Sequence, residues 1–105
     1  CAAKAGVNQV VRVLAMEWGP EGVRVNGVSP GPIAGTEGMA RLAPNEAVTK
    51  AITGRIALRR FGEIDEIAES AVFLCSDSAA YITGTILECD GGSQLGDARN
   101  PMERA

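Results

Sequence analysis

The stretch VRVNGVSPGPI, residues 23–33, decides the fold class, because a short β-branched run ends there in a loop stiffened by two prolines. We expect a strand over Val23–Ser29. A second run, Thr83–Asp90, is closed by Gly91-Gly92 and predicts a last strand. Strands separated by helical sequence pair in parallel, so the predicted class is α/β with a parallel sheet.

Helical periodicity predicts the segments around these strands. Apolar residues recur at three- and four-residue steps from Ala3 to Trp18, and Gly19-Pro20 ends that helix. Glu46–Gly54 is a weaker helical stretch. From Gly62 the period returns strongly, with acidic residues crowding the first turn, where the helix dipole favours negative charge (Glu63, Asp65 and Glu66).

Two strands are too few for a parallel sheet that is covered on both faces. The sequence therefore predicts neighbouring strands outside it, and we expect residues 1–105 to be the carboxyl-terminal fragment of a single domain. A non-catalytic module that only packs or assembles with other chains stays open as an alternative. Residues 97–105 are polar and are expected to form a loose tail.

Composition excludes several classes of function. The net charge of −3 and the pI near 4.9 argue against a nucleic-acid partner, and no apolar run is long enough for a membrane helix. The amino-terminal residues lack the layout of a signal peptide. With no histidine, neither Ser-His catalysis nor a histidine metal site is expected, and the cysteines at 1, 75 and 89 are expected to pack as reduced, small apolar residues.

Six short motifs occur in an order typical of one enzyme family. They are Leu14–Asn26 (LAMEWGPEGVRVN), Ser29–Ile33 (SPGPI), Arg60–Gly62 (RFG), Phe73–Asp77 (FLCSD), Tyr81–Gly84 (YITG) and Asp90–Gly92 (DGG). From Cys1 to about Leu95 the chain resembles the carboxyl-terminal part of short-chain dehydrogenases/reductases. The resemblance implies a Rossmann-type, doubly wound parallel sheet that binds NAD(P), with its Gly-rich phosphate loop upstream of these residues.

The same resemblance assigns Lys4 as the catalytic lysine of a Tyr-x-x-x-Lys motif, whose tyrosine position would fall one residue before Cys1. In the family this lysine holds the nicotinamide ribose and lowers the pKa of the tyrosine, as a nearby ammonium group does by direct charge interaction. The isolated fragment is expected to be inactive, because it lacks the neighbouring strands of the sheet and the phosphate loop. No metal site is expected.

The loop after the first predicted strand is the second candidate region. The resemblance implies that backbone groups around Ile33 meet the nicotinamide carboxamide and that Pro30-Gly31 borders the ring, with Pro32 and Thr36 as further cofactor-binding candidates. Many family members carry a threonine two positions after the isoleucine, whereas Gly35 stands there in this chain and Thr36 follows it.

The spelling of residues 30–38 (PGPIAGTEG), together with Glu17–Pro20 (EWGP), resembles the 2,4-dienoyl-CoA reductases of the peroxisomal type and their bacterial relatives. This implies hydride transfer from NADPH, with NAD as the alternative cofactor, to an acyl-CoA or carbonyl substrate. A 3-oxoacyl-(acyl-carrier-protein) reductase and an alcohol or sugar dehydrogenase remain alternatives. We expect a cytoplasmic protein, with the peroxisomal matrix as the second location, and a homo-tetramer with Trp18 and the segment from Ile82 to Cys89 near its interfaces.

Overall fold

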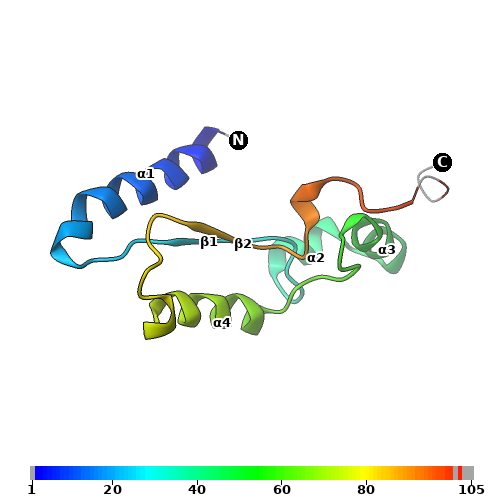
Figure 1. Ribbon diagram of the computed structural model, residues 1–105. Coiled ribbons are helices and arrows are strands. Elements are labelled where there is room, and N and C mark those ends of the chain that lie inside the picture. Colours follow the sequence, from blue (N-terminus) through cyan, green and yellow to red (C-terminus); the bar gives the residue numbers. More distant parts are fainter. Residues whose placement is uncertain (1, 101, 103–105) are drawn as a thin grey trace. The chain divides into compact units, whose positions relative to one another are not determined.

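The computed structural model describes residues 2–100 and 102 (Figure 1). The helices are α1 (Ala2–Trp18), α2 (Glu37–Leu42), α3 (Glu46–Arg55) and α4 (Ile64–Cys75), and the strands are β1 (Gly27–Pro30) and β2 (Ile86–Cys89). Short 3-10 turns occupy Gly19–Glu21, Asp77–Ala79 and Ser93–Leu95. The described residues form two compact units, one from 2–29 and 68–88, the other from 30–67 and from 89 onward.

Strands β1 and β2 pair in parallel. The N–H of Gly27 donates to the carbonyl of Thr85 at 2.9 Å, and the N–H of Gly31 donates to the carbonyl of Cys89 at 3.1 Å. Both partners advance by four residues in the same direction, which is the register of a parallel pair. The predicted α/β class is therefore confirmed.

Both strands begin later than the sequence predicts. The chain before β1 is held largely by side chains: Val25 N–H donates to Thr83 Oγ1 at 3.0 Å, and the Asn26 amide donates to the Ile82 carbonyl and accepts from Thr85 N–H. One backbone bond, from Gly84 N–H to the Val25 carbonyl at 2.7 Å, joins the same segments. Because side chains replace regular strand pairs and Gly84 has a φ of +79°, residues 23–26 and 83–85 lie outside the strands.

In the first unit, α1 packs where glycines leave room for it. The Cβ of Ala15, which is buried, lies 3.4 Å from the point where a Cβ on Gly84 would be. A methyl carbon of Val11 lies 3.8 Å from the corresponding point on Gly27. Arg24 closes the other side of this unit, because its guanidinium donates to the Leu74 carbonyl at 2.7 Å.

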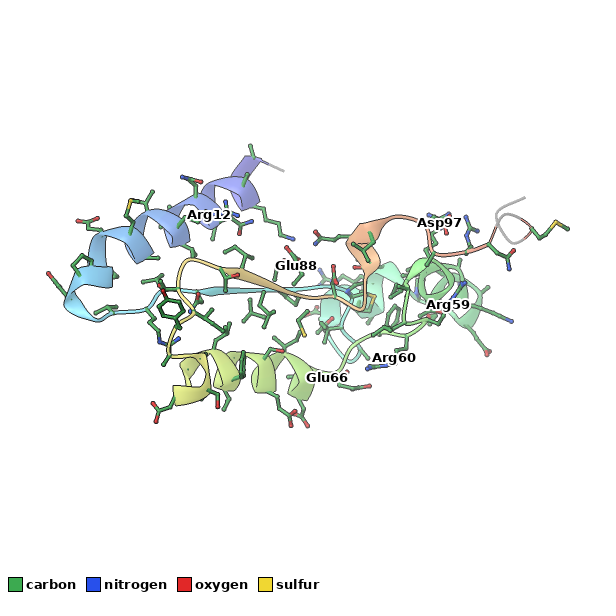
Figure 2. The ribbon with its side chains drawn as sticks, viewed as in Figure 1. Arg12, Arg59, Arg60, Glu66, Glu88 and Asp97 are labelled. Atoms are coloured by element: carbon green, nitrogen blue, oxygen red, sulfur yellow. The ribbon has the colours of Figure 1, made fainter. Side chains whose placement is uncertain are left out.

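In the second unit, each short helix begins with a side-chain cap. Asn45 Oδ1 accepts from Val48 N–H at 2.9 Å and starts α3. The start of α4 is fixed by Glu66, whose carboxylate accepts from Glu63 N–H at 2.9 Å and from the Arg60 guanidinium at 2.7 Å. The Arg60 hydrogen bonds, followed by the one from Glu63 N–H, lower the pKa of Glu66 to about 2. The acidic helix start predicted from the sequence is confirmed (Figure 2).

The cysteines differ from expectation. Cys75 is exposed on α4 and Cys89 is half-buried in β2, where its Sγ lies 3.9 Å from the Glu66 carbonyl oxygen. The prediction that each cysteine is packed in the interior is therefore wrong for Cys75, the exposed last residue of α4. Cys1 lies outside the described residues.

The backbone of Gly31 approaches Asp90 very closely. A Cβ on Gly31 would lie 2.6 Å from the Cβ of Asp90 and 2.7 Å from its Cα. Real carbon atoms do not approach this closely without a shift, and the obstructing atoms belong mainly to the backbone. Only glycine therefore allows β1 and its following loop to run beside Asp90 in this way.

Replacing Gly31 tests this close approach. In the full-length protein, Gly31→Ala is expected to lower the free energy of unfolding by about 1–3 kcal/mol, the usual cost of overpacking. Thermal and urea unfolding would measure the change. Gly38→Ala in α2 is the matched control, because nothing lies within 4 Å of the Cβ it would add. Equal stability of the two variants would contradict the proposed constraint.

Candidate functional site

The loop that follows β1 presents backbone groups beyond the end of the strand. Ile33 forms a parallel bridge with Gly62: Gly62 N–H donates to the Pro32 carbonyl, and Ala34 N–H donates to the Gly62 carbonyl, each at 2.9 Å. In such a bridge the residue between the two bonded groups turns its own N–H to the opposite side. The N–H of Ile33 therefore points away from Gly62 and suits a carbonyl acceptor such as a carboxamide.

Lys4 is exposed in the first turns of α1, in the first unit. Ala15 of α1 lies beside Gly84, whose N–H donates to the Val25 carbonyl, and Val11 lies beside Gly27. The helix passes these two positions in the reverse order, so α1 runs antiparallel to β1 (Figure 1).

The predicted cofactor residues thus fall into two groups. Pro30, Gly31, Pro32, Ile33 and Thr36 belong to the second unit, where they form one continuous loop, and Lys4 belongs to the first unit. The structure brings the loop residues together.

The side chain of Thr36 stabilises the conformation of this loop. Its Oγ1 accepts from Met39 N–H at 3.1 Å, which caps the start of α2, and donates to the Ile33 carbonyl at 3.2 Å. Both interactions hold the loop in shape. A contact from this hydroxyl to a cofactor would have to share an oxygen already used as a helix cap.

A cavity of about 500 Å³ lies beside the loop, and sequence reasoning missed it. It is bounded by one face of α3, by Pro32 and by the turn after β2, and its lining is Pro32, Ala47, Val48, Ala51, Ile52, Arg55, Ile56 and Ser93. The signal was present in the sequence, since small and branched apolar residues recur in α3 at a three- to four-residue spacing.

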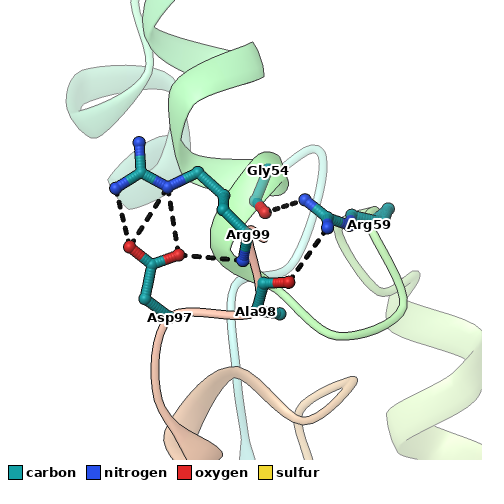
Figure 3. Close-up of polar contacts among 5 residues, drawn as sticks. All are labelled: Gly54, Arg59, Asp97, Ala98 and Arg99. Atoms are coloured by element: carbon teal, nitrogen blue, oxygen red, sulfur yellow. Dashed lines mark hydrogen bonds and ion pairs between the residues drawn. The ribbon is translucent and has the colours of Figure 1, made fainter. Parts of the chain in front are cut away.

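Two arginines, Arg59 and Arg99, lie where α3 ends (Figure 3). Arg59 donates to the Gly54 carbonyl and, at 3.0 Å, to the Ala98 carbonyl. Arg99 forms a two-pronged ion pair with Asp97, with its shortest distance at 2.6 Å. Hydrogen bonds from Arg99 hold the pKa of Asp97 well below its usual range.

Arg59 also adopts an unusual backbone conformation. Its φ is +61°, and it is the one non-glycine residue with a positive φ in the part of the chain that the structure describes. Such a conformation costs on the order of 1–2 kcal/mol and persists only where the surroundings hold it. The two carbonyls bound by its guanidinium supply that hold. They also attach the beginning of the 97–105 segment, whose residues 101 and 103–105 lie outside the described residues.

Across residues 2–100 and 102, no group of three or more cysteine, aspartate or glutamate side chains could hold a metal ion. Within the same residues, no helix combines the length and the apolar character needed to cross a membrane.

Known proteins resemble this chain in sequence and in fold. Residues 1–94 match the family model described as enoyl-(acyl carrier protein) reductase. The peroxisomal 2,4-dienoyl-CoA reductase, (3E)-enoyl-CoA-producing, of Danio rerio is 48% identical over 103 residues, which cover 98% of this chain and 34% of that protein. The chain spans about a third of the length of the curated relatives it matches.

Two solved structures share the fold. One is 4-hydroxyisoleucine dehydrogenase complexed with NADH, with a TM-score of 0.83 and 34% identity over 90% of this chain and 39% of that chain. The other is YwfH, an NADPH-dependent reductase involved in bacilysin biosynthesis, with a TM-score of 0.79 and 31% identity over 85% of this chain and 37% of that chain. The parallel strand pair, the loop after β1 and the match over residues 1–94 together show that this chain has a Rossmann-type fold and belongs to the short-chain dehydrogenase/reductase family.

Proposed function

We propose that this chain is the carboxyl-terminal part of a single Rossmann domain in an NADPH-dependent 2,4-dienoyl-CoA reductase. The observation that carries the proposal is the 48% identity, over nearly the whole chain, to a relative described as a peroxisomal 2,4-dienoyl-CoA reductase. That relative's name also supports the peroxisomal matrix as a location, beside the cytoplasm.

The residues of the loop fit a nicotinamide cofactor. Ile33 N–H faces away from its bridge with Gly62, as a donor to the carboxamide requires. When bound, the cofactor would supply the hydride. NADPH is favoured because related reductases of this fold use it, and NADH remains the alternative because other relatives bind it.

In the proposed reaction, a 2,4-dienoyl thioester would become a 3-enoyl thioester. It would take a hydride at C5, which oxidises NADPH to NADP⁺, and a proton from water at C2, so that the remaining double bond lies at C3. Negative charge spreads towards the thioester oxygen as the hydride arrives. The ammonium of Lys4 would hold the ribose hydroxyls, and its positive charge near the reacting atoms would stabilise that developing charge.

An assay of the full-length protein tests this proposal. Incubation with NADPH and a 2,4-dienoyl-CoA is expected to consume NADPH and yield a 3-enoyl-CoA, identified by mass spectrometry and NMR. The 105-residue chain alone is expected to give no turnover, because its sequence contains no G-x-G-x-x-G phosphate loop. Turnover only with 3-oxoacyl thioesters, or only with sugars or alcohols, would move the protein to another branch of the family, and no turnover at all would favour a non-catalytic role.

Removing the Lys4 amine is expected to reduce catalysis strongly. In the full-length protein, Lys4→Ala should lower kcat by about 10²–10⁴-fold, the range typical of acid–base groups, while the melting temperature stays near that of the wild type. Arg12→Ala is the matched control, because Arg12 is another exposed cation on α1 (Figure 2). Near-normal turnover by the Lys4 variant would return this lysine to the role of a solvated helical residue.

The full-length protein is further proposed to be a homo-tetramer. Large apolar side chains are exposed on α1 and α4, among them Val10, Trp18, Val72 and Phe73. Surfaces of this kind are covered in stable proteins, either by a partner copy or by other parts of the same chain. Residues near β2, from Ile82 to Cys89, are expected to lie at the same interface as α4.

Light scattering on the full-length protein tests the assembly. Val72→Asp, which changes a side chain that is 68% exposed on α4, is expected to dissociate the tetramer into smaller species. Leu42→Asp is the control, since Leu42 is equally exposed, at 67%, but lies on α2. A wild-type protein that is monomeric at micromolar concentration would contradict the proposal.

A further inference from the structure

The cavity beside α3 has the character of a site for an apolar group with one charged end. Its walls are alanine, valine, isoleucine and proline side chains, and the polar side chains in its lining are those of Arg55 and Ser93. A volume of about 500 Å³ falls within the range of small-molecule sites, which join mainly apolar walls to a few polar groups.

The far wall of this cavity is fixed by two glycines. Ile56, which is 3% exposed, packs beneath Gly91, where an added Cβ would lie 3.1 Å from its side chain. An added Cβ on Gly92 would lie 2.7 Å from the Cβ of Ala57. The turn is held in addition by Leu58 N–H, which donates to the Gly91 carbonyl at 3.0 Å. Ser93 therefore has a defined place, and the cavity is built into the fold.

One end of the cavity carries a cation. Arg55 is the last residue of α3 and is exposed, and its charge adds to the hydrogen bonds from Arg99 that lower the pKa of Asp97. Gly54 brings two more arginines near it: the point where a Cβ would stand lies 3.8 Å from Arg99 Cδ and 3.9 Å from Arg59 Nη1. Of these arginines, Arg99 forms the ion pair with Asp97 (Figure 3).

This local charge contrasts with the chain as a whole. The net charge of the chain is −3, which repels anionic ligands, so a local excess of positive charge is needed to bind one. The Gly54 carbonyl, which would also repel an anion at the end of α3, is already bound by Arg59. A phosphate group is an anion that a guanidinium group can bind through two parallel hydrogen bonds.

We propose that Arg55 is a specificity-determining residue: it binds a phosphate of the acyl carrier, while the α3 cavity takes the apolar part of the thioester next to it. This inference rests on the proposed function, because it assumes an acyl-thioester substrate. Arg55 would raise the affinity for thioesters on phosphate-bearing carriers. It would not raise the affinity for uncharged carbonyl compounds, which have no phosphate to bind.

Two substrates with the same acyl chain test the role of Arg55 in the full-length protein. One is the 2,4-dienoyl-CoA, and the other is the 2,4-dienoyl thioester of N-acetylcysteamine, which has no phosphate. Arg55→Gln is expected to raise KM for the CoA thioester about 10-fold, as loss of a charge-assisted hydrogen bond does, with kcat unchanged. KM for the N-acetylcysteamine thioester and for NADPH should stay within about twofold, which also shows that the variant is folded.

Lys50→Gln is the matched control, because Lys50 is a cation of the same helix that does not line the cavity, and it should leave both KM values unchanged. Arg55→Lys is expected to retain part of the preference for CoA. Equal effects of Arg55→Gln on the two thioesters, or none on either, would overturn the inference. Calorimetry with CoA alone tests the inference without an activity assay: if Arg55→Gln binds CoA as tightly as the wild type does, the inference is overturned. If the wild-type protein reduces neither thioester, that result counts against the proposed function instead.

Discussion

The close contact between Gly31 and Asp90 is the constraint on which the candidate site depends. Because Gly31 has no side chain, its N–H reaches the Cys89 carbonyl and the parallel pairing continues to the last residue of β1. The two prolines around it then leave the chain few conformations. Together these features direct Ile33 into its bridge with Gly62, and that bridge decides which way the Ile33 N–H faces.

Much of this fold could be predicted from the sequence, because it follows from local patterns. Helical spacing predicted α1, α3 and α4, and Pro30-Gly31-Pro32 marked the end of β1. The strand limits could not be predicted, because Thr83 and Asn26 hold the chain through side-chain hydrogen bonds to residues far away in the sequence. Periodicity contains no information about such distant partners.

The features around α3 show the same limit more clearly. Nothing local announces that Arg59 has a positive φ, since the conformation is held by the carbonyls of Gly54 and Ala98, five and 39 residues away. The cavity likewise requires the turn at Gly91 to pack on Ile56. Sequence reasoning could name the arginines of this region, but only the folded chain shows that Arg55 stands at the edge of an apolar cavity.

We propose that the loop from Pro30 to Ile33 binds the nicotinamide end of the cofactor and that Lys4 of α1 binds its ribose. A crystal structure of the full-length protein with NADPH tests this most directly. We expect the carboxamide to accept a hydrogen bond from Ile33 N–H and the Lys4 ammonium to donate to the ribose hydroxyls. A nicotinamide ring bound away from this loop, or a Lys4 side chain turned to solvent, would contradict it.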